Sequence, residues 1–548
     1  MNKCSSLRWA WALTRGRRMS ILFSILIGVI KVILGLLFVW LSKQVIDIAV
    51  ADREGNIGLF SIFLVSTLVV EIGCSALQGS IDVKNEAILK NNLRGRFFSR
   101  VLNSRWEGTE RHHTGEVMNR LEEDVRVVAD TCSNVLPATV SAALQAVGAF
   151  AFLAILEPAL AWLVLCIFPL ILVMIKVCGG KLKMLTEEIR KSDGHIQALM
   201  QESLQKRVIL LSLLRTRVTE EHLKKEQDVL YEKTIRRNRF TVFNRTLIMI
   251  GFGGGYLTAF LWGAWQMRNG LVTFGMLTAF LQLVGLLQRP ILDLGRRLPG
   301  LIHALASVSR LGELAGLEQE KHSLPVSGKT VHLCGIRMKD VYYAYPQAVR
   351  RIFHSFNYDF KPGTMTAIMG ETGVGKSTLT RLILGLLQPQ QGSVVFYDKH
   401  GKEYPASPFT RQAILYVPQG NSLISGTIRA NLLAGNEEAD EGQMLEALYH
   451  AAAEFVTELP GGLDTFCGEG GAGLSEGQAQ RIAIARALLS KGEIMLLDEF
   501  SSALDSDTEK RLMQRLQTSG AGKTVIIVTH KQEVADMCGE TVRLTRID

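Results

Sequence analysis

The feature that most constrains this chain is a set of six apolar runs in its amino-terminal half. An apolar helix of about 20 residues, rising about 1.5 Å per residue, crosses the roughly 30 Å hydrocarbon layer of a bilayer. The mean hydropathy of +0.18 and the 47% hydrophobic content agree with such helices, and they exclude a disordered or collagen-like chain. The sequence therefore predicts an integral, multi-pass membrane protein with spans at about 19–47, 57–79, 135–156, 159–178, 246–267 and 274–298.

The charge of the connections predicts their side of the membrane. Two connections, at about 80–134 and 179–245, are long and rich in Lys and Arg, whereas the other three are short. Because Lys and Arg are retained on the cytoplasmic side, both long connections and both termini are expected in the cytoplasm. The net charge of +9 fits this retention better than it fits nucleic-acid binding. We expect the spans to continue into the cytoplasm as helices for tens of ångströms.

The amino terminus and the cysteines exclude several other classes of protein. The apolar run from Met19 to about Leu41 is too long for a signal peptide, so we expect a retained first helix. The eight cysteines are scattered and include no CxxC pair, so neither a disulfide framework nor a zinc site is expected.

A change of composition near residue 312 divides the chain. Apolar and charged helical segments alternate before it, and short β-like runs, glycine-rich loops and soluble helices follow it. The polar segment that carries Pro325 and Gly328 is typical of a linker. We expect a transmembrane domain at 1–311, a linker at 312–330 and a second domain at 331–548.

Two ionisable residues fall inside the predicted spans, Lys31 in the first and Glu71 in the second. Charged side chains are costly in hydrocarbon, so one interpretation is that the two residues line a water-filled cavity as a pair. The other interpretation stays open: Lys31 extends its ammonium group to the interface, and Glu71 lies near one.

A glycine-rich loop in the second domain has the pattern of a phosphate-binding loop. The motif G-x-x-x-x-G-K-S runs from Gly370 to Ser377, between an apolar β-like run and a helical one. Backbone N–H groups and a helix N-terminus favour phosphate oxygens. We expect Lys376 to reach the β- and γ-phosphates of ATP and Ser377 to bind Mg²⁺. The expected nucleotide contacts are Gly370, Glu371, Thr372, Gly373, Val374, Gly375, Lys376, Ser377 and Thr378.

Two further apolar strands end in polar residues that suit the same site. Asp498 and Glu499 follow one strand, where the first can hold Mg²⁺ and the second can accept a proton from attacking water. The other strand leads to His530, which we expect to contact the γ-phosphate, because ligands bind at the carboxyl ends of parallel strands. The expected catalytic residues are Glu499, His530 and Lys376.

The segment Leu474-Ser475-Glu476-Gly477-Gln478 makes the pattern recognisable. It resembles the LSGGQ signature of ATP-binding-cassette (ABC) proteins, and it stands in the family's order between the phosphate loop and Asp498. The resemblance implies that the cassette also contains an aromatic residue that stacks on adenine, a glutamine that senses Mg²⁺ and the transmembrane domain, and a D-loop aspartate. The residues that it assigns to the nucleotide or the metal are Ser475, Gly477, Gln478, Tyr345, Gln419 and Asp505.

The amino-terminal half resembles the six-helix membrane domain of exporters in this family. Thr114-Gly115-Glu116, with Arg120 and Asp124, is similar to the segment around the first coupling helix, and Glu202-Ser203-Leu204 begins a stretch similar to the second. The resemblance implies an all-α six-helix transmembrane domain followed by an α/β P-loop ATPase domain.

Two positions depart from the family pattern. Glu476 stands where the signature usually has glycine, and we expect its carboxylate to point outward and activity to survive. The segment 468–471 lacks the arginine that many exporters have near its third position, which leaves the coupling of the two domains open.

The resemblance implies a half-transporter, because the family's site combines the phosphate loop of one cassette with the signature of another. We expect a homodimer that hydrolyses ATP with Mg²⁺ and exports a hydrophobic or amphipathic cargo (lipid, drug or peptide) by alternating access. A bacterial inner membrane is the expected location. A nucleotide-gated channel or regulatory subunit with little transport is the alternative, and retention of Glu499 favours turnover over it.

Two other classes are excluded at this stage. A peptide-processing exporter has a protease domain before its first helix, and this chain has too few residues there for a domain. A soluble cassette protein that acts on nucleic acid is excluded by the apolar spans.

Overall fold

The computed structural model describes residues 9, 11–50, 54–109, 114–320, 332–345, 351–468, 473–519 and 522–546. The side chains at 108, 109, 165–178, 291, 292, 296, 298, 299 and 519 are outside this description. Contacts divide the chain into two compact units. One comprises Met1–Ser99 with Thr114–Gly316, and the other comprises Arg100–His113 with Leu317–Asp548.

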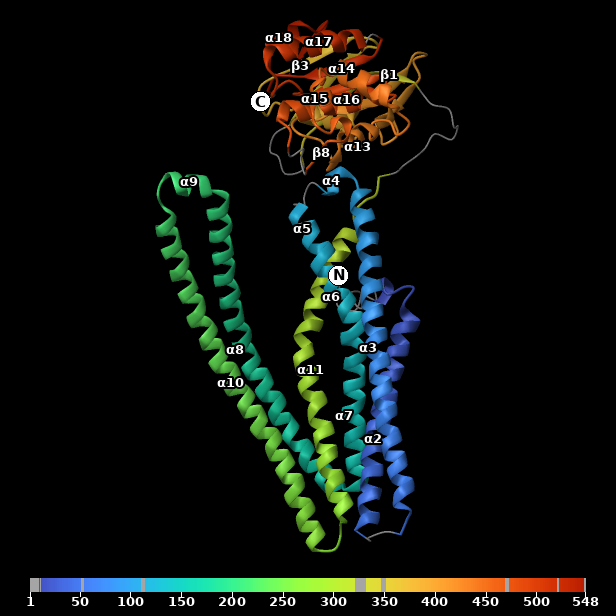
Figure 1. The fold of residues 1–548 in the computed structure, drawn as a ribbon, viewed down its shortest axis with the longest axis vertical. Helices are drawn as coiled ribbons and strands as arrows, with labels where there is room; N and C mark the ends of the chain where they lie inside the picture. The colour runs from blue at the N-terminus through green and yellow to red at the C-terminus, as the bar shows by residue number, and fades with distance from the viewer. Residues whose placement is uncertain are drawn as a thin grey trace. The chain divides into compact units, whose positions relative to one another are not determined.

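The first unit is built from long helices, as predicted. All six apolar runs lie in helices, and α8 and α10 form a long pair joined by the short α9 (Arg207–Ser212) (Figure 1). The long helices are α2 (Arg18–Ala49), α3 (Ile57–Leu102), α7 (Leu136–Leu156), α8 (Pro158–Gln205), α10 (Thr216–Arg268) and α11 (Phe274–Ala315).

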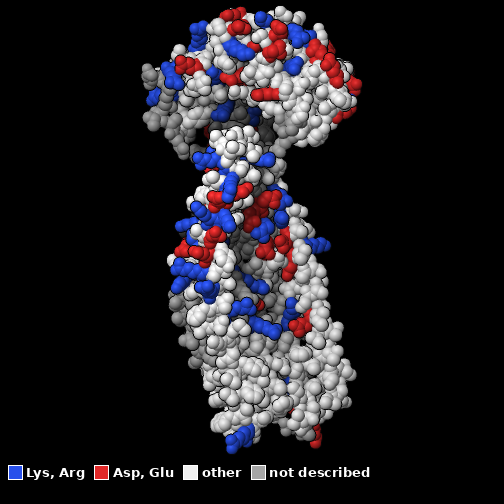
Figure 2. Space-filling model, turned by 60° about the vertical axis from the view of Figure 1, so that its left-hand side comes forward, with Lys and Arg blue, Asp and Glu red and all other residues white. Residues whose placement is uncertain are grey.

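Five of the described helices are long and apolar enough to cross a membrane. The fourth predicted run, 159–178, lies in α8, but most of its side chains are outside the description. With 53 residues, α10 is about 80 Å long, well beyond the hydrocarbon thickness, so the fifth apolar run is part of a longer uninterrupted helix. Figure 2 shows a band of this unit that is almost without charge on the face in view, while Lys, Arg, Asp and Glu gather further along its length.

The connection between α3 and α7 is broken into short pieces rather than one helix. An ion pair fastens it to α11: the guanidinium of Arg120, 6% exposed, lies 2.8 Å from Glu313. The same guanidinium lies 2.7 Å from Glu116 within the connection. Arg310 of α11 donates to Asp124 at 2.8 Å. The pieces are α4 (Trp106–Thr109), α5 (Thr114–Asn119), the π-helical turn η1 (Arg120–Asp124), α6 (Val125–Asp130) and the π-helical turn η2 (Thr131–Val135).

The second unit contains an α/β core around two main sheets. An antiparallel sheet has the order β2-β1-β4-β5, and a parallel sheet has the order β11-β3-β10-β9-β6. The antiparallel strands are β1 (Leu333–Tyr343), β2 (Phe353–Phe360), β4 (Gln391–Asp398) and β5 (Glu403–Pro405). The parallel strands are β3 (Met365–Met369), β6 (Ile414–Val417), β9 (Ile494–Asp498), β10 (Thr524–Val528) and β11 (Glu540–Arg543). A further pair is β7 (Gly426–Thr427) with β8 (Phe466–Cys467).

The parallel sheet is buried on both faces, as its continuous apolar strands predict. Along β9, Ile494 and Leu496 belong to the core that includes α12, while Met495 and Leu497 belong to the core beneath α14, α16 and α17. The helices are α12 (Lys376–Ile383), α13 (Ile428–Leu433), α14 (Glu441–His450), α15 (Phe455–Glu458), α16 (Glu476–Leu489), α17 (Ser506–Ser519) and α18 (Gln532–Asp536). Short 3₁₀ turns are η3 (Thr410–Ala413) and η4 (Gly462–Asp464).

Candidate nucleotide site

The predicted phosphate loop joins β3 to α12, as the motif requires. Gly373 and Gly375 have φ of 82° and 114°, in the left-handed region that glycine adopts readily. A Cβ at Gly375 would lie 2.5 Å from the Cγ2 of Ile352, so a side chain there would also clash. Glycine at these positions lets the backbone curve tightly in front of the helix N-terminus, where N–H groups attract anions.

Lys376 and its neighbours have different environments. The Lys376 side chain is largely buried, and its Nζ donates to the carbonyl oxygen of Gly370 at 2.7 Å, so the ammonium group lies over the loop. Ser377 is exposed, with its hydroxyl available to a metal or phosphate. Thr378 is buried, and its hydroxyl lies 3.4 Å from the hydroxyl of Tyr345. Exposed positions of the loop are Glu371, Thr372 and Gly373, and Val374 is buried.

The parallel sheet brings Asp498 to the edge that carries the loop. Val528 of β10 pairs with Asp498 on one side and with Ile368 of β3 on the other, so these strands end together. The Asp498 side chain is largely buried. Burial, with the charge of Glu499 beside it, raises the pKa of Asp498 to about 6, and the nearby ammonium of Lys376 opposes this shift.

Gln419, Glu499 and His530 meet at the same edge. Glu499 follows β9 with φ of 46°, and its N–H donates to the carbonyl of Val528. Its Oε2 accepts a hydrogen bond from Gln419 Nε2 at 2.6 Å, and its Oε1 lies 3.8 Å from His530 Nδ1. Three residues that are spread over more than a hundred positions of the sequence therefore form one cluster.

Tyr345 lies next to the phosphate-loop helix. Its hydroxyl accepts from Arg381 of α12 at 2.9 Å, and its ring packs edge-on against Tyr343. Arg381 was not among the predicted site residues. A lone arginine on a helix carries no sequence signal of its function, and only the fold places it beside Tyr345.

The signature segment forms the amino-terminal cap of α16. Ser475 and Gln478 make a reciprocal capping box, in which each side chain bonds the backbone N–H of the other. Glu476 is the first helical residue and is exposed, and its orientation relative to a nucleotide stays a prediction. A carboxylate there also interacts favourably with the helix dipole.

Gly477 has a packing role that the sequence did not reveal. It is buried, and a Cβ at this position would lie 2.6 Å from the carbonyl oxygen of Ala503. The adjacent Asp505 accepts from the N–H of Thr508 at 3.0 Å and so caps α17. The Thr508 N–H lowers the pKa of Asp505. In this structure both residues make contacts within their own cassette, and their predicted contacts with nucleotide stay predictions.

A segment from the amino-terminal half belongs to this unit. Residues 103–105 pair with 318–320: Arg105 N–H donates to the carbonyl of Glu318, and Glu320 N–H donates to that of Asn103. Glu320 in turn makes a bidentate pair with Arg411, at 2.7 and 2.8 Å. We call residues 103–105 and 317–320, with Arg411, the linker anchor.

The helix α4 extends this contact toward the nucleotide site. The ring of Trp106 lies 5.8 Å from the guanidinium of Arg381, which also bonds Tyr345. The N–H of Gln388 lies 3.4 Å from the Glu107 carboxylate. Arg381 thus contacts both Trp106 and Tyr345, the predicted adenine-stacking residue. The segment 468–471, where the family arginine is missing, lies mostly outside the described residues.

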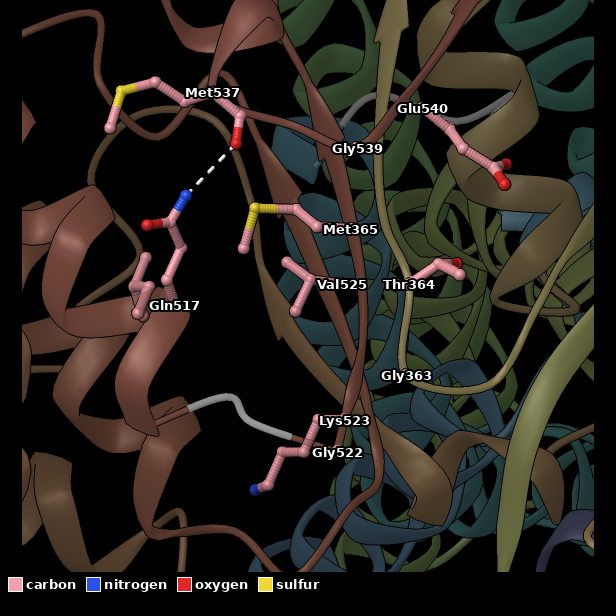
Figure 3. A pocket seen from close by; sticks show the side chains of 11 residues that line it. Gly363, Thr364, Met365, Gln517, Gly522, Lys523, Val525, Met537, Gly539 and Glu540 are labelled. Atoms are coloured by element: carbon pink, nitrogen blue, oxygen red, sulfur yellow. Dashed lines mark hydrogen bonds between the residues drawn. The ribbon is translucent and has the colours of Figure 1, made fainter.

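The same unit also has a hollow at the edge of the parallel sheet opposite to the phosphate loop. Its volume is about 470 Å³, and Met365, Val525 and Glu540, at or near the amino ends of three parallel strands, line it (Figure 3). Gln517 donates to the carbonyl of Met537 across one side. Since the phosphate loop follows the carboxyl end of β3, this hollow is not the nucleotide site.

The donor set at the loop fits magnesium. Among the described residues, no group of three or more His, Cys, Asp or Glu side chains could hold a metal ion by itself. Mg²⁺ is typically bound by one or two carboxylates together with substrate phosphates and water. Asp498 and the exposed residue Ser377 supply such oxygen donors. Gln419 is hydrogen-bonded to Glu499, the residue next to Asp498.

Two family models match this chain. The ABC transporter transmembrane region matches residues 19–291, and the ABC transporter model matches residues 353–502. Together they cover both predicted halves.

Similar proteins span most of the chain. An uncharacterized ABC transporter ATP-binding protein of Bacillus subtilis (strain 168), YfiB, is 27% identical over 498 residues, which are 90% of this chain and 85% of that protein. An ATP-dependent lipid A-core flippase of Aromatoleum aromaticum is 27% identical over 457 residues, 81% of this chain and 73% of that protein. A solved structure of a bacterial Atm1-family ABC exporter with ATP bound matches with a TM-score of 0.78 and 20% identity, over 97% of this chain and 94% of that chain, which shows a common fold.

Proposed function

We propose that this chain, which belongs to the ABC transporter family, is one of two identical halves of an exporter for an amphipathic cargo. Its membership makes it an ATP-hydrolysing membrane transporter, and the predicted family and fold class are confirmed. The identity of the partner, the cargo and the residue roles are the proposed part.

The observation that carries the proposal is the cluster of Gln419, Glu499 and His530 beside Asp498 and Lys376. Glu499 is the carboxylate best placed to take the proton of an attacking water, because it stands at the strand end next to Asp498. Lys376 brings positive charge to the loop that holds the phosphates, and His530 offers a ring nitrogen near Glu499. Bound Mg²⁺ would neutralise charge on the phosphates, held by Ser377 and Asp498.

A composite site accounts for the exposed signature. Ser475 and Gln478 lie at the exposed amino end of α16, whose helix dipole attracts a phosphate of a second cassette. One phosphate loop and one signature per chain then give two complete sites in a dimer. Since this chain keeps Lys376, Asp498 and Glu499, two copies suffice, and closure of the cassettes on ATP would drive the spans between inward- and outward-facing states.

The relatives and the spans support the proposed cargo and membrane. Several relatives are named ATP-dependent lipid A-core flippase, and this supports the hydrophobic or amphipathic cargo that we assign to this chain. The positive-inside pattern favours a cytoplasmic location of both termini and the cassette. The bacterial relatives support a bacterial inner membrane.

The test is phosphate release by the full-length protein in lipid nanodiscs, with its mass measured in saturating Mg·ATP. Glu499→Gln should lower phosphate release at least a hundredfold, as expected for loss of a catalytic base, and should accumulate a dimer with two nucleotides. Glu533→Gln, an exposed carboxylate of the same cassette, is the matched control. A strictly monomeric protein in Mg·ATP, or equal rates in the two variants, would overturn the proposal.

A further inference from the structure

The helical unit encloses a cavity of about 240 Å³ between α2, α3, α7 and α11. Both ionisable residues that the sequence places inside the spans, Lys31 and Glu71, line it. Its other polar side chains are Gln78, Ser141 and Gln145, and its apolar ones are Val32, Leu36 and Leu286. The cavity thus joins charged, amide and aliphatic surfaces in the predicted membrane region.

Lys31 and Glu71 lie at different depths. At about 1.5 Å per residue, Glu71 lies roughly 21 Å, and Lys31 roughly 27 Å, along their helices from the short connection between α2 and α3. Their levels differ by about 6 Å. No ion pair joins these two described side chains in the structure.

The cavity therefore has separate positive and negative ends. Lys31 Nζ donates to Gln78 Oε1 at 3.2 Å, which uses one of its three N–H donors. The carboxylate of Asp82, which accepts from Ser24 and does not line the cavity, also interacts with the charge of Lys31. Charged groups are costly inside a membrane unless a partner or water compensates them. A ligand that carries both a positive and a negative charge compensates both ends of the cavity at once. A singly charged ligand compensates only one end and leaves the other without an opposite charge.

Glycines shape the walls of the cavity. A Cβ at Gly28 would collide with the hydroxyl of Ser141, so glycine there allows α7 to approach α2. A Cβ at Gly35 would meet nothing within 4 Å, so this position borders open space. A larger side chain at Gly35 would enter the cavity without a backbone clash.

We propose that this cavity binds the zwitterionic head group of an amphiphile, with the anionic group at Lys31 and the cationic group at Glu71. Its volume equals that of about eight water molecules, which is enough for a head group but not for a whole lipid. The acyl chain leaves along Val32, Leu36 and Leu286. This assignment rests on the proposed export function, and it narrows the cargo to one charge class.

The experiment measures equilibrium binding of radiolabelled amphiphiles to the full-length Glu499→Gln protein in nanodiscs, with empty nanodiscs subtracted. Three probes share a dodecyl chain: dodecylphosphocholine (zwitterionic), dodecyl phosphate (anionic) and dodecyltrimethylammonium (cationic). Since this variant background needs no hydrolysis, binding is measured whether or not the protein exports.

The expected result is a reversal of preference with charge. The Glu499→Gln protein should bind the zwitterion at least tenfold more tightly than either other probe. Adding Lys31→Met should make the cationic probe the tightest, and adding Glu71→Gln should make the anionic probe the tightest. A purely structural role of either residue would weaken all three probes alike, and that result would overturn the proposal.

A matched glycine pair tests the location. Gly35→Leu should abolish saturable binding of the zwitterion, whereas Gly73→Leu, an exposed α3 position with nothing within 4 Å of its Cβ and no part in the cavity, should leave it within twofold. Equal binding by the two leucine variants would also overturn the proposal. If the native chain and the Glu499→Gln variant released phosphate at equal rates, that result would instead count against the export function alone.

Discussion

Gln419 Nε2 lies 2.6 Å from Glu499 Oε2, so the glutamine that follows β6 bonds the carboxylate that follows its neighbour β9. The two strands are adjacent and parallel, and both residues extend from their carboxyl ends. A displacement of the Gln419 loop therefore acts directly on the position of Glu499.

Gln419→Leu removes this hydrogen bond while keeping a side chain of similar length. A hydrogen bond to a charged group contributes about 1.5–3 kcal/mol, so the loss of positioning should lower phosphate release by about tenfold or more. Gln412→Leu, at an exposed position just before β6, is the control and should change the rate less than twofold. Equal rates in both variants would show that Gln419 does not position Glu499.

Gly477→Ala places a Cβ 2.6 Å from the carbonyl oxygen of Ala503, which is closer than such atoms approach. Overpacking of this kind costs about 1–3 kcal/mol, and it displaces the signature from the loop that precedes Asp505. We expect phosphate release to fall at least tenfold and the unfolding midpoint to fall by several degrees. Gly539→Ala, whose Cβ would lie 3.8 Å from its nearest neighbour, should alter neither quantity.

Glu476→Gly restores the usual family signature. Because Glu476 is exposed at the first position of α16, its removal loses a favourable dipole interaction of about 0.3–1 kcal/mol and adds backbone freedom. We expect slightly lower thermal stability and phosphate release within threefold of the native rate. A rise of more than tenfold would mean that the carboxylate points toward the nucleotide and inhibits the site.

Asp498→Asn should stabilise the protein without nucleotide at neutral and alkaline pH. Burial raises the pKa of Asp498 to about 6, above the unfolded value of about 3.9, so its ionised form is disfavoured in the folded state. This cost, at most about 3 kcal/mol, is fully present above pH 6 and disappears below about pH 4, where the carboxyl is protonated in both states.

Thermal unfolding at pH 8, 6 and 4.5 measures the effect. The midpoint of Asp498→Asn should exceed that of the native protein at pH 8, and the difference should shrink toward pH 4.5. Asp507→Asn, an exposed aspartate of α17, should show no such trend. A difference that is constant with pH would exclude the ionisation of Asp498 as its cause.

Glu320→Gln should weaken the linker anchor. The pair with Arg411 is bidentate and partly shielded, with side-chain exposures of 14% and 28%, so we expect a loss of about 1–2 kcal/mol. Glu318→Gln is the matched control, because the Glu318 carboxylate that pairs with Arg105 is 76% exposed and should contribute less than about 1 kcal/mol. A double-mutant cycle of Glu320→Gln with Arg411→Gln measures the coupling, and a coupling of zero would contradict this assignment.

Local chemistry made much of this molecule predictable. Apolar runs long enough to span a membrane predict the long helices. The spacing of Gly370, Lys376 and Ser377 predicts a tight phosphate-binding loop followed by a helix. The order of parallel strands then explains why Asp498 and His530 end at one edge. Each of these predictions depends on residues within a short stretch of chain.

Contacts between distant segments were not predictable. Nothing in the sequence indicates that Trp106 stacks on Arg381, or that Glu320 pairs with Arg411, since single aromatic and charged residues are common on any surface. The π-helical turns at 120–124 and 131–135 also carried no signal, because each inserts an extra residue into an otherwise ordinary helical pattern. The signature motif predicts a nucleotide contact for Gly477, but it does not indicate the close approach to the carbonyl of Ala503, which by itself requires glycine.

The linker anchor makes the ATPase unit discontinuous in sequence. Removing everything before residue 331 would strip it of the strand-like pieces 103–105 and 317–320, which would expose the guanidinium of Arg411 and leave the Leu384 carbonyl that Arg411 bonds more open to water. An ATPase fragment that starts at residue 331 would therefore be a poorer enzyme to crystallise or assay than one beginning at Leu317. Supplying a synthetic peptide of residues 100–109 to that longer fragment would be a direct way to rebuild the missing surface in a test tube.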